Sequence, residues 1–378
     1  MLGAPTTADL RPAGAAAATA DLPHALAHVR ADLAAACGPP RPAHLPPLAP
    51  SGEAVRTLTP GQRPARNAVR RRIPARRPHT AATTAGQLVY AVGDVHGRYD
   101  LFVELVERLA ADAAANALGR QPVLVLLGDY VDRGPDSALV LEALVQLPRA
   151  ADWRVVALKG NHEQALLRFV AEPQLSAQWL GFGGAATLAS YGVAPPAEAE
   201  GTAGLVRARD ELLAAMPAAH LHRLQTLETL AVVGDYAFVH AGVAPGVPLE
   251  DQHENDLLWI RDEFLGKGAG GKGGAGTPPA AGFTPTGHVI VHGHTWTGPR
   301  VALTPQRIGL DTGAYETGVL SAVRLDGAAV AVLQVGAVPL PEPEPAPAAP
   351  AEPAPVIGGW TPVARPTDFT RGLGYAPA

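Results

Sequence analysis

Six side chains of the kinds that bind metal ions stand in short glycine-containing motifs of this sequence. The motifs are "GDVHG", "GDYVDRG", "GNHE", "HAG" and "GHT", and the six side chains are those of Asp94, His96, Asp129, Asn161, His240 and His294. Carboxylate, imidazole and amide groups without thiolate suit manganese, iron or zinc better than calcium or a structural zinc. Six such groups can hold two metal ions if one carboxylate bridges them. The pattern therefore favours a dinuclear metal site.

The spacing in the first motif supports this interpretation. In an extended segment, Asp94 and His96 point to one side and Val95 to the other, as a shared metal requires. Adjacent glycines let the backbone turn sharply near an ion. Taken singly, a "GD" that ends a strand is usually a turn, and "GNHE" is more often a helix cap. The functional interpretation rests on the complete set, in order.

Three apolar runs must carry the first motifs. "LVYAVGD", "VLVLLGD" and "WRVVALKGN" each end in a glycine and a polar residue, which predicts buried strands. Helical patterns over residues 99–117 and 136–147 separate them, with Leu101, Leu105 and Leu109 on one face. Alternating strands and helices indicate parallel strands with crossover helices, whose ligands bind beyond the carboxyl ends of the strands. We expect the three motifs to meet at one edge.

Shorter strands follow a helical, loop-rich stretch at about residues 164–228. They are "LAVVGD", "YAFVHAG", "HVIVHGHT", "RIGLDTGA", "LSAVRL" and "AVAVLQV". We predict that they form a second, mixed or antiparallel sheet packed on the first. The fold class is then α/β (α+β), a two-sheet β-sandwich flanked by helices. The glycine-rich segment between Leu265 and Phe283 is expected to be a flexible loop, because it lacks the features of a phosphate-binding loop.

Composition divides the chain into three parts. Residues 1–86 are rich in Ala and Pro, with one possible helix in 21–37 and an arginine-rich segment from Arg56 to Arg77. We expect a disordered extension; the alternative is weak contact of that segment with a polyanion such as RNA or DNA. Residues 87–336 are the expected catalytic domain. Residues 337–378 are a Pro-rich tail, with a frayed end preferred over a docking peptide.

Charge and cysteine content exclude several classes of protein. The formal net charge of -5 argues against a polyanion binder over the whole chain. Cys37 is the only cysteine, which excludes a disulfide framework and a thiolate zinc cluster and suits a reducing compartment. We expect neither a signal peptide nor a membrane helix, and therefore a cytoplasmic protein.

The motifs, in this order, resemble those of the calcineurin-like metallophosphoesterases. "GDVHG", "GDYVDRG", "GNHE" and "HAG" narrow the resemblance to the phosphoprotein phosphatase family of serine/threonine phosphatases. "GDYVDRGPDS", "LLWIRDEF", "VHGHT" and "DTGAY" are most similar to its bacterial branch, which is related to the symmetrical diadenosine tetraphosphatases. The resemblance covers about Gln87 to Val335 and neither extension. It implies the four-layer metallophosphoesterase fold with a dinuclear centre, for which we expect manganese, with iron or zinc as alternatives.

The resemblance implies a role for each motif residue. Asp94 and His96 would hold the first metal, Asp129 would bridge, and Asn161, His240 and His294 would hold the second. A hydroxide between the two ions would attack phosphorus in line with the leaving oxygen. The substrate phosphate would be bound by Arg133, Arg261 and Asn161. His162 matches the general acid, and Asp132 its carboxylate partner, which would keep the imidazole protonated.

Other residues near the motifs carry weaker expectations. His292 is expected to be a core or supporting histidine. Asp311 would form a turn or, less favoured, orient a metal-bound histidine. Glu163 would pair with a site arginine or favour a helix start, Asp136 would lie at a helix N-cap, and Arg98 and His288 have no expected chemistry. Phe182 stands where comparable sequences have a polar residue, which puts in doubt a polar substrate contact from its loop.

Three functions remain open from the sequence. The first is a metal-dependent phosphatase acting on phosphoserine or phosphothreonine, with a phosphoprotein or phosphopeptide as partner. The second is a symmetrical diadenosine tetraphosphatase that cuts a nucleotide phosphoanhydride. The third is an inactive scaffold that binds phosphoproteins or RNA. A nucleotide would need an aromatic or apolar slot beside the metals, whereas a phosphopeptide needs an open groove.

Overall fold

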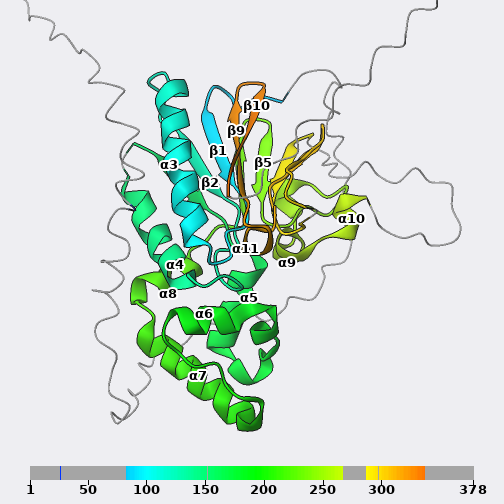
Figure 1. Ribbon diagram of the computed structural model, residues 1–378. Coiled ribbons are helices and arrows are strands. Elements are labelled where there is room, and N and C mark those ends of the chain that lie inside the picture. The colour runs from blue at the N-terminus through cyan, green and yellow to red at the C-terminus, as the bar shows by residue number, and fades with distance from the viewer. Residues whose placement is uncertain (1–25, 27–81, 151, 267–286, 297, 337–378) are drawn as a thin grey trace, which may run out of the picture. The chain divides into compact units, whose positions relative to one another are not determined.

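A computed structural model describes Leu26 and residues 82–150, 152–266, 287–296 and 298–336 (Figure 1). Its first sheet has the strand order β10-β9-β1-β2-β3. The bounds of these strands are Leu88–Val92 (β1), Val123–Leu126 (β2), Arg154–Ala157 (β3), Leu320–Asp326 (β9) and Ala329–Val335 (β10). The second sheet has the order β4-β5-β6-β8-β7. Its strands are Leu230–Val233 (β4), Tyr236–Val239 (β5), Val289–His292 (β6), Ala302–Leu303 (β7) and Arg307–Gly309 (β8).

The three parallel strands at the start of the domain form as the sequence predicts. β1 pairs with β2 up to Val92↔Leu126, and β2 pairs with β3 up to Leu126↔Ala157. Helices α3 (Tyr99–Asn116) and α4 (Ser137–Gln146) make the crossover connections. Because the three strands end in register, the loops that follow them leave the sheet at one edge. This part of the fold prediction is confirmed.

The assignment of β9 and β10 to the second sheet is wrong. β9 pairs antiparallel with β1, with Val89 opposite Leu325, and β10 continues the same sheet as its edge strand. The burial of β9 explains the difference. Leu325 packs between the two sheets, whereas Leu320 packs under the helices, so β9 needs cover on both faces. A position inside the first sheet provides that cover.

Three apolar clusters separate four layers. The first cluster joins α3 and α4 to one face of the first sheet, and the second lies between the two sheets. The third joins the second sheet to α9 (Glu254–Trp259) and α10 (Asp262–Leu265). Burying one core leucine such as Leu105 contributes about 1.5–3 kcal/mol, so many such side chains offset the entropy of ordering these layers. The predicted helix-flanked two-sheet sandwich is confirmed.

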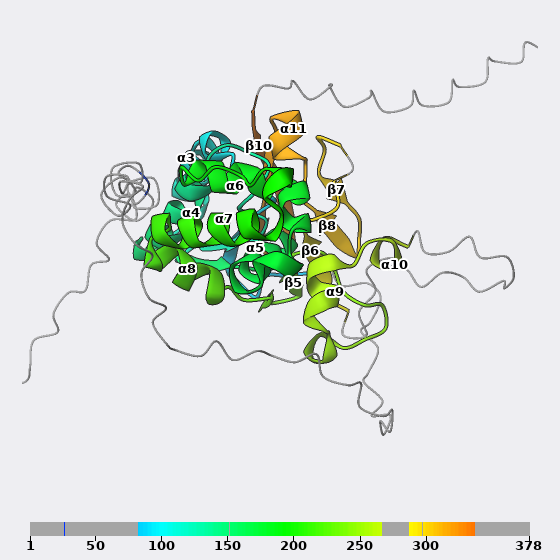
Figure 2. The same ribbon diagram turned by 90° about the horizontal axis from the view of Figure 1, so that it is seen from below.

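The remaining helices gather at the end of the sandwich where β1 and β2 finish (Figures 1 and 2). They are α5 (Asn161–Ala171), α6 (Ala185–Ser190), α7 (Gly201–Ala215) and α8 (Ala218–Gln225), and a short helix α11 (Ala314–Thr317) precedes β9. A π-helical turn over Leu180–Gly184 leads into α6. The helical middle of the chain therefore covers the edge at which the motifs lie.

Several predicted features lie outside the described residues. They are the arginine-rich segment, the glycine-rich loop, the Pro-rich tail and all of the helix in 21–37 except Leu26. Leu26 is helical and buried, and the Tyr99 hydroxyl donates to its carbonyl at 3.5 Å. Thr83, which the sequence analysis assigns to the N-terminal extension, donates its backbone N–H to the Asp235 carboxylate at 2.9 Å. In the part of the chain that is described, every helix is too short or too polar to span a bilayer.

Candidate metal centre

Backbone strain is concentrated in the loops at the carboxyl ends of the strands. Among the residues that the structure describes, seven non-glycine residues have positive φ, and five of these are predicted site residues. The five are His96 (45°), Asp129 (52°), Asp132 (74°), Arg133 (69°) and His294 (64°). A side chain in this region of φ costs about 1–3 kcal/mol, and such residues cluster at functional sites. The strained backbone therefore marks the predicted site.

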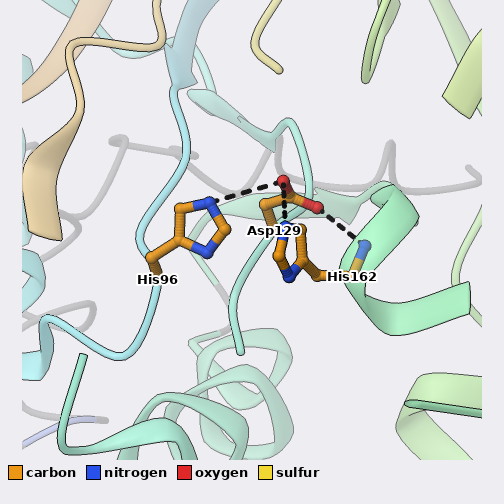
Figure 3. A group of neighbouring side chains, drawn as sticks. All are labelled: His96, Asp129 and His162. Carbon is orange, nitrogen blue, oxygen red and sulfur yellow. Dashed lines mark hydrogen bonds and ion pairs between the residues drawn. The ribbon is translucent and has the colours of Figure 1, made fainter. Parts of the chain in front are cut away.

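Asp129 lies between His96 and His162 (Figure 3). Its Oδ2 is 3.5 Å from His96 Nε2 and 3.9 Å from His162 Nε2, and its Oδ1 is 3.3 Å from His240 Nε2. Burial alone would raise the pKa of Asp129, but the neighbouring His240, His162 and His96 outweigh it and hold that pKa well below its ordinary value. Asp129 is thus an ionised carboxylate with imidazoles on both of its oxygens.

Two buried groups of potential ligands share Asp129. One contains His96, Asp129 and His162, and the other contains Asp129, His240 and His294; within each group the ligand atoms lie within 4.8 Å of one another. A shared carboxylate is the arrangement that a bridging ligand needs. His162, which we predicted as the general acid, is a member of the first group.

Asp94 and Asn161 join the same centre from neighbouring loops. Asp94 Oδ2 accepts a hydrogen bond from the backbone N–H of His294 at 2.9 Å. Asn161 Oδ1 is 2.8 Å from both His240 Nε2 and His294 Nδ1. The structure therefore brings all six predicted ligand residues together, and their individual roles stay predictions.

The donor set fits divalent metal ions. Asp94 Oδ1 and His294 Nε2 are buried and have no hydrogen-bond partner among the described residues. Burial, with the nearby charges of Asp311 and Asp129, raises the pKa of Asp94 well above its ordinary value. Buried polar atoms are normally paired, so unpaired atoms beside crowded carboxylates indicate a place for cations. These buried His and Asp groups are consistent with a site for two metals.

Two histidines are oriented by main-chain carbonyls. His240 Nδ1 donates to the carbonyl of Leu127 at 2.9 Å, and His96 Nδ1 donates to that of Val131 at 2.9 Å. When the ring is neutral, each bond leaves the lone pair on Nε2, as in many metal-binding histidines. Burial lowers the pKa of His96 to about 3, so this ring stays neutral and able to coordinate at neutral pH.

The predicted pair of His162 and Asp132 is formed. His162 Nδ1 is 2.7 Å from Asp132 Oδ2, and both side chains are buried. Burial alone would lower the pKa of His162, but Asp129 and Asp132 outweigh it and raise that pKa above 6.5. Two further residues bind Asp132, namely Trp179 and Thr187. Sequence reasoning missed both, although they stand in "WLGFGGAATLASYG", because a Trp and a Thr in such a segment give no signal of this role.

The two predicted phosphate-binding arginines differ in position. Arg133 Nη1 is 2.7 Å from His96 Nε2, and its guanidinium lies 4.6 Å from the centre of the Tyr315 ring. Arg261 is exposed at the start of α10. Its charge contributes to the low pKa of His294, for which burial is the larger cause. Arg133 therefore lies in the site and Arg261 at its margin.

Glu163 has a larger structural role than we expected. It supports the start of α5, as predicted, by accepting the backbone N–H of Gly160. The expected pairing with an arginine is replaced by bonds from the backbone N–H groups of Asp129, Tyr130 and Val131. Four main-chain donors satisfy this buried carboxylate.

The weaker expectations have simple outcomes. His292 is a buried core histidine, with its ring 4.9 Å from that of Phe264. Asp311 accepts the backbone N–H of Gly313 at 2.9 Å, the bond of a turn-forming Asp. Arg98 bonds to Asp100 and to the carbonyl of Ala314. Asp136 takes the N-cap position of α4, as predicted, but its side chain makes no capping hydrogen bond. His288 is half-buried just before β6.

A cavity of about 190 Å³ adjoins the centre. It is lined by Ala165, Arg168, Ser176, Gln178, Trp179, Phe182 and Trp259. The Phe182 ring is 6.3 Å from that of His162, and the Trp259 ring is 6.4 Å from that of His294. Phe182 and Trp259 are 6.3 Å apart. Aromatic side chains thus form part of the wall beside the proposed acid.

Comparison with known families identifies the fold and its chemistry. Residues 88–306, more than half of the chain, match the family described as "Calcineurin-like phosphoesterase". The chain belongs to the calcineurin-like phosphoesterase family. The resemblance found from the motifs is therefore confirmed, and with the His/Asp groups above it identifies a metal-dependent phosphoesterase.

Curated relatives of this calcineurin-like phosphoesterase differ in what their names say they act on. It is 32% identical over 164 residues to a symmetrical bis(5'-nucleosyl)-tetraphosphatase of Aromatoleum aromaticum, covering 42% of this chain and 45% of the relative. It is 36% identical over 96 residues to serine/threonine-protein phosphatase 1 of Salmonella typhimurium, covering 25% and 38%. It is 35% identical over 89 residues to a zinc-dependent endopolyphosphatase of Saccharomyces cerevisiae, covering 24% of each chain. The chain spans less than half the length of each of these relatives.

Proposed function

We propose that this phosphoesterase hydrolyses phosphoserine and phosphothreonine in proteins or peptides, with manganese as its metal. The observation that carries the proposal is the buried pair of His162 and Asp132 beside Asp129. The alkoxide that leaves from serine or threonine is a strong base and needs a proton from a positioned acid. A nucleoside phosphate that leaves from an anhydride is much less basic, because its second pKa is about 6, and it needs that proton less.

Three side chains of the site have a definite task in this proposal. Arg133 would bind the phosphate oxygens with its planar guanidinium, a geometry that pairs well with phosphate. Asp132 would hold the Nδ1 proton of His162, so that Nε2 carries the proton to be donated to the leaving oxygen. Two divalent ions, when bound, would neutralise phosphate charge and lower the pKa of a bound water.

A second candidate function is the cleavage of a dinucleotide such as diadenosine tetraphosphate. The observation in its favour is the cavity walled by Phe182 and Trp259, since an aromatic slot is what a base needs for stacking. A peptide with a large apolar side chain next to the phosphorylated residue would use the same surface. The cavity is therefore compatible with both candidate functions.

One experiment separates the two candidates. Metal-stripped full-length protein would be given manganese, iron or zinc in turn and assayed on a phosphothreonine peptide and on diadenosine tetraphosphate. Peptide turnover restored by manganese, with little cleavage of the dinucleotide, is the expected result. Cleavage of the dinucleotide alone would establish the second candidate, and inactivity on both substrates with every metal would contradict both.

A further inference from the structure

The carboxylate of Asp132 accepts hydrogen bonds from three side chains. Oδ2 is 2.7 Å from His162 Nδ1 and 3.0 Å from Trp179 Nε1, and Oδ1 accepts the hydroxyl of Thr187 at 2.7 Å. Asp132 is fully buried. Both of its oxygens are therefore satisfied by the protein, and two of the three donors come from residues outside every motif of the metal site.

Thr187 binds both the side chain and the backbone N–H of Asp132. In addition to donating to Oδ1, its hydroxyl accepts the backbone N–H of Asp132 at 2.9 Å and lies 3.1 Å from the Ser137 hydroxyl. Asp132 has a φ of 74°, a conformation that only surrounding contacts can maintain. Thr187 stands in α6, far along the chain, so this helix holds the Asp132 loop in its strained form.

Trp179 is itself held rigidly. Its ring is fully buried and lies 4.6 Å from that of Phe169. A Cβ on Gly184 would overlap the indole, so the glycine lets the following turn pack against the ring. With its ring fixed in this way, the indole N–H has one direction in which to donate, and that direction is toward Asp132 Oδ2.

We propose that Trp179 and Thr187 are positioning residues for proton donation by His162. They would fix the plane of the Asp132 carboxylate, and that plane determines where His162 directs Nε2. Without the hydroxyl of Thr187, Oδ1 would lose its side-chain donor inside the protein, and the carboxylate would turn to find another. This inference rests on the proposed function, in which His162 protonates the leaving oxygen.

The same arrangement links the acid to the cavity. Trp179 lines the cavity together with Phe182, whose ring lies 6.3 Å from that of His162. The side chain that would orient the acid therefore also lines the cavity.

Three substitutions test the role with matched controls. Thr187→Val keeps the shape of the side chain and removes the hydroxyl, whereas Thr187→Ser keeps the hydroxyl. Trp179→Phe keeps an aromatic ring against Phe169 and removes the N–H. Single-turnover rates would be measured at saturating manganese on 4-nitrophenyl phosphate, phenyl phosphate and a phosphothreonine peptide, whose leaving groups are increasingly basic. Melting temperature and bound metal would be measured for each variant.

We expect the variants to lose more of the single-turnover rate as the leaving group becomes more basic. Thr187→Val and Trp179→Phe should each slow the peptide reaction about tenfold, the effect of one lost hydrogen bond to a charged group, and leave 4-nitrophenyl phosphate nearly unchanged. Thr187→Ser should restore the wild-type pattern. His162→Asn is the reference, with the same trend and a larger loss of about 10²- to 10⁴-fold on the peptide.

Two results would separate failure of this inference from failure of the proposed function. If His162→Asn shows the trend but Thr187→Val and Trp179→Phe slow all three substrates equally, the two residues have only a structural role and the inference is overturned. If His162→Asn itself slows all three equally, His162 is not the acid, and the proposed function loses its main support.

Discussion

The Oε2 atom of Glu163 lies 2.9 Å from the backbone nitrogen of Asp129, and the same oxygen lies 2.8 Å from that of Gly160. One buried carboxylate therefore joins the loop after β2 to the start of α5. The first of these segments carries Asp129 and the second carries Asn161. The position of one predicted metal ligand relative to another thus depends on a residue that binds no metal itself.

Glu163→Gln should destabilise the metal-free protein. The amide keeps one acceptor oxygen and places an NH₂ group against main-chain donors, so at least one buried N–H loses its partner, at a cost of about 1–3 kcal/mol. Urea unfolding would measure the change, with Glu172→Gln as a control because Glu172 is exposed at the other end of the same helix. Equal unfolding midpoints for the two variants would contradict this role of Glu163.

Asp129→Asn should abolish turnover and reduce the bound metal. The substitution removes the charge that both ligand groups share, whereas His162→Asn should leave most of the metal in place. Metal content after dialysis, measured by atomic emission, distinguishes the two variants. Because His162 lies in the first ligand group, equal metal loss in both variants would make it a ligand instead of the acid.

The pH dependence of turnover should report the pair of His162 and Asp132. His162 must be protonated to act as an acid, and its pKa lies above 6.5 because Asp129 and Asp132 outweigh the effect of burial. Turnover of a phosphothreonine peptide should therefore fall as the pH rises through that pKa. Asp132→Asn removes one of the charges that raise the pKa of His162, so the fall should move to lower pH. Profiles of kcat against pH for manganese-loaded enzyme would show this, and an unmoved profile would contradict it.

Tyr315→Leu should weaken substrate binding more than it slows turnover. The Tyr315 ring faces the Arg133 guanidinium at 4.6 Å and meets the His96 ring edge-on at 5.4 Å. Losing a cation–π contact of about 0.5–1 kcal/mol should raise KM about two- to fivefold and raise the inhibition constant of inorganic phosphate similarly. Tyr315→Phe keeps the ring and should behave as wild type. A fall in kcat at unchanged KM would instead mean that Tyr315 acts in the chemical step.

The location of the candidate centre can be predicted from the sequence because its residues lie in local patterns. Asp94 and Asp129 each follow a glycine that ends a buried strand, and parallel strands in register must deliver such residues to one edge. The periodicity of the strands and helices was enough to place them. The ligand types then indicated metals without any knowledge of contacts between distant segments.

What the sequence could not show depends on long-range packing. Burial of both faces of β9 decides to which sheet this strand belongs. The sequence of a short apolar strand does not show which strand it pairs with. Trp179 and Thr187 look like ordinary core residues until their distances to Asp132 are known. In the sequence, Phe182 is only an apolar residue where comparable sequences have a polar one. In the structure its ring lies 6.3 Å from that of His162, and the next residue, Gly183, has a φ of 110°.

The place of β9 in the first sheet has a consequence for biosynthesis. β1 pairs with β2 on one side and with β9 on the other, and more than 200 residues separate β1 from β9. During translation, the second edge of β1 stays open until the ribosome has released the segment ending at Asp326. The loops that carry Asp94, Asp129 and Asn161 are made early, but the sheet that holds them closes among the last steps. A nascent chain halted after "GNHE" therefore exposes a strand edge able to pair with other chains.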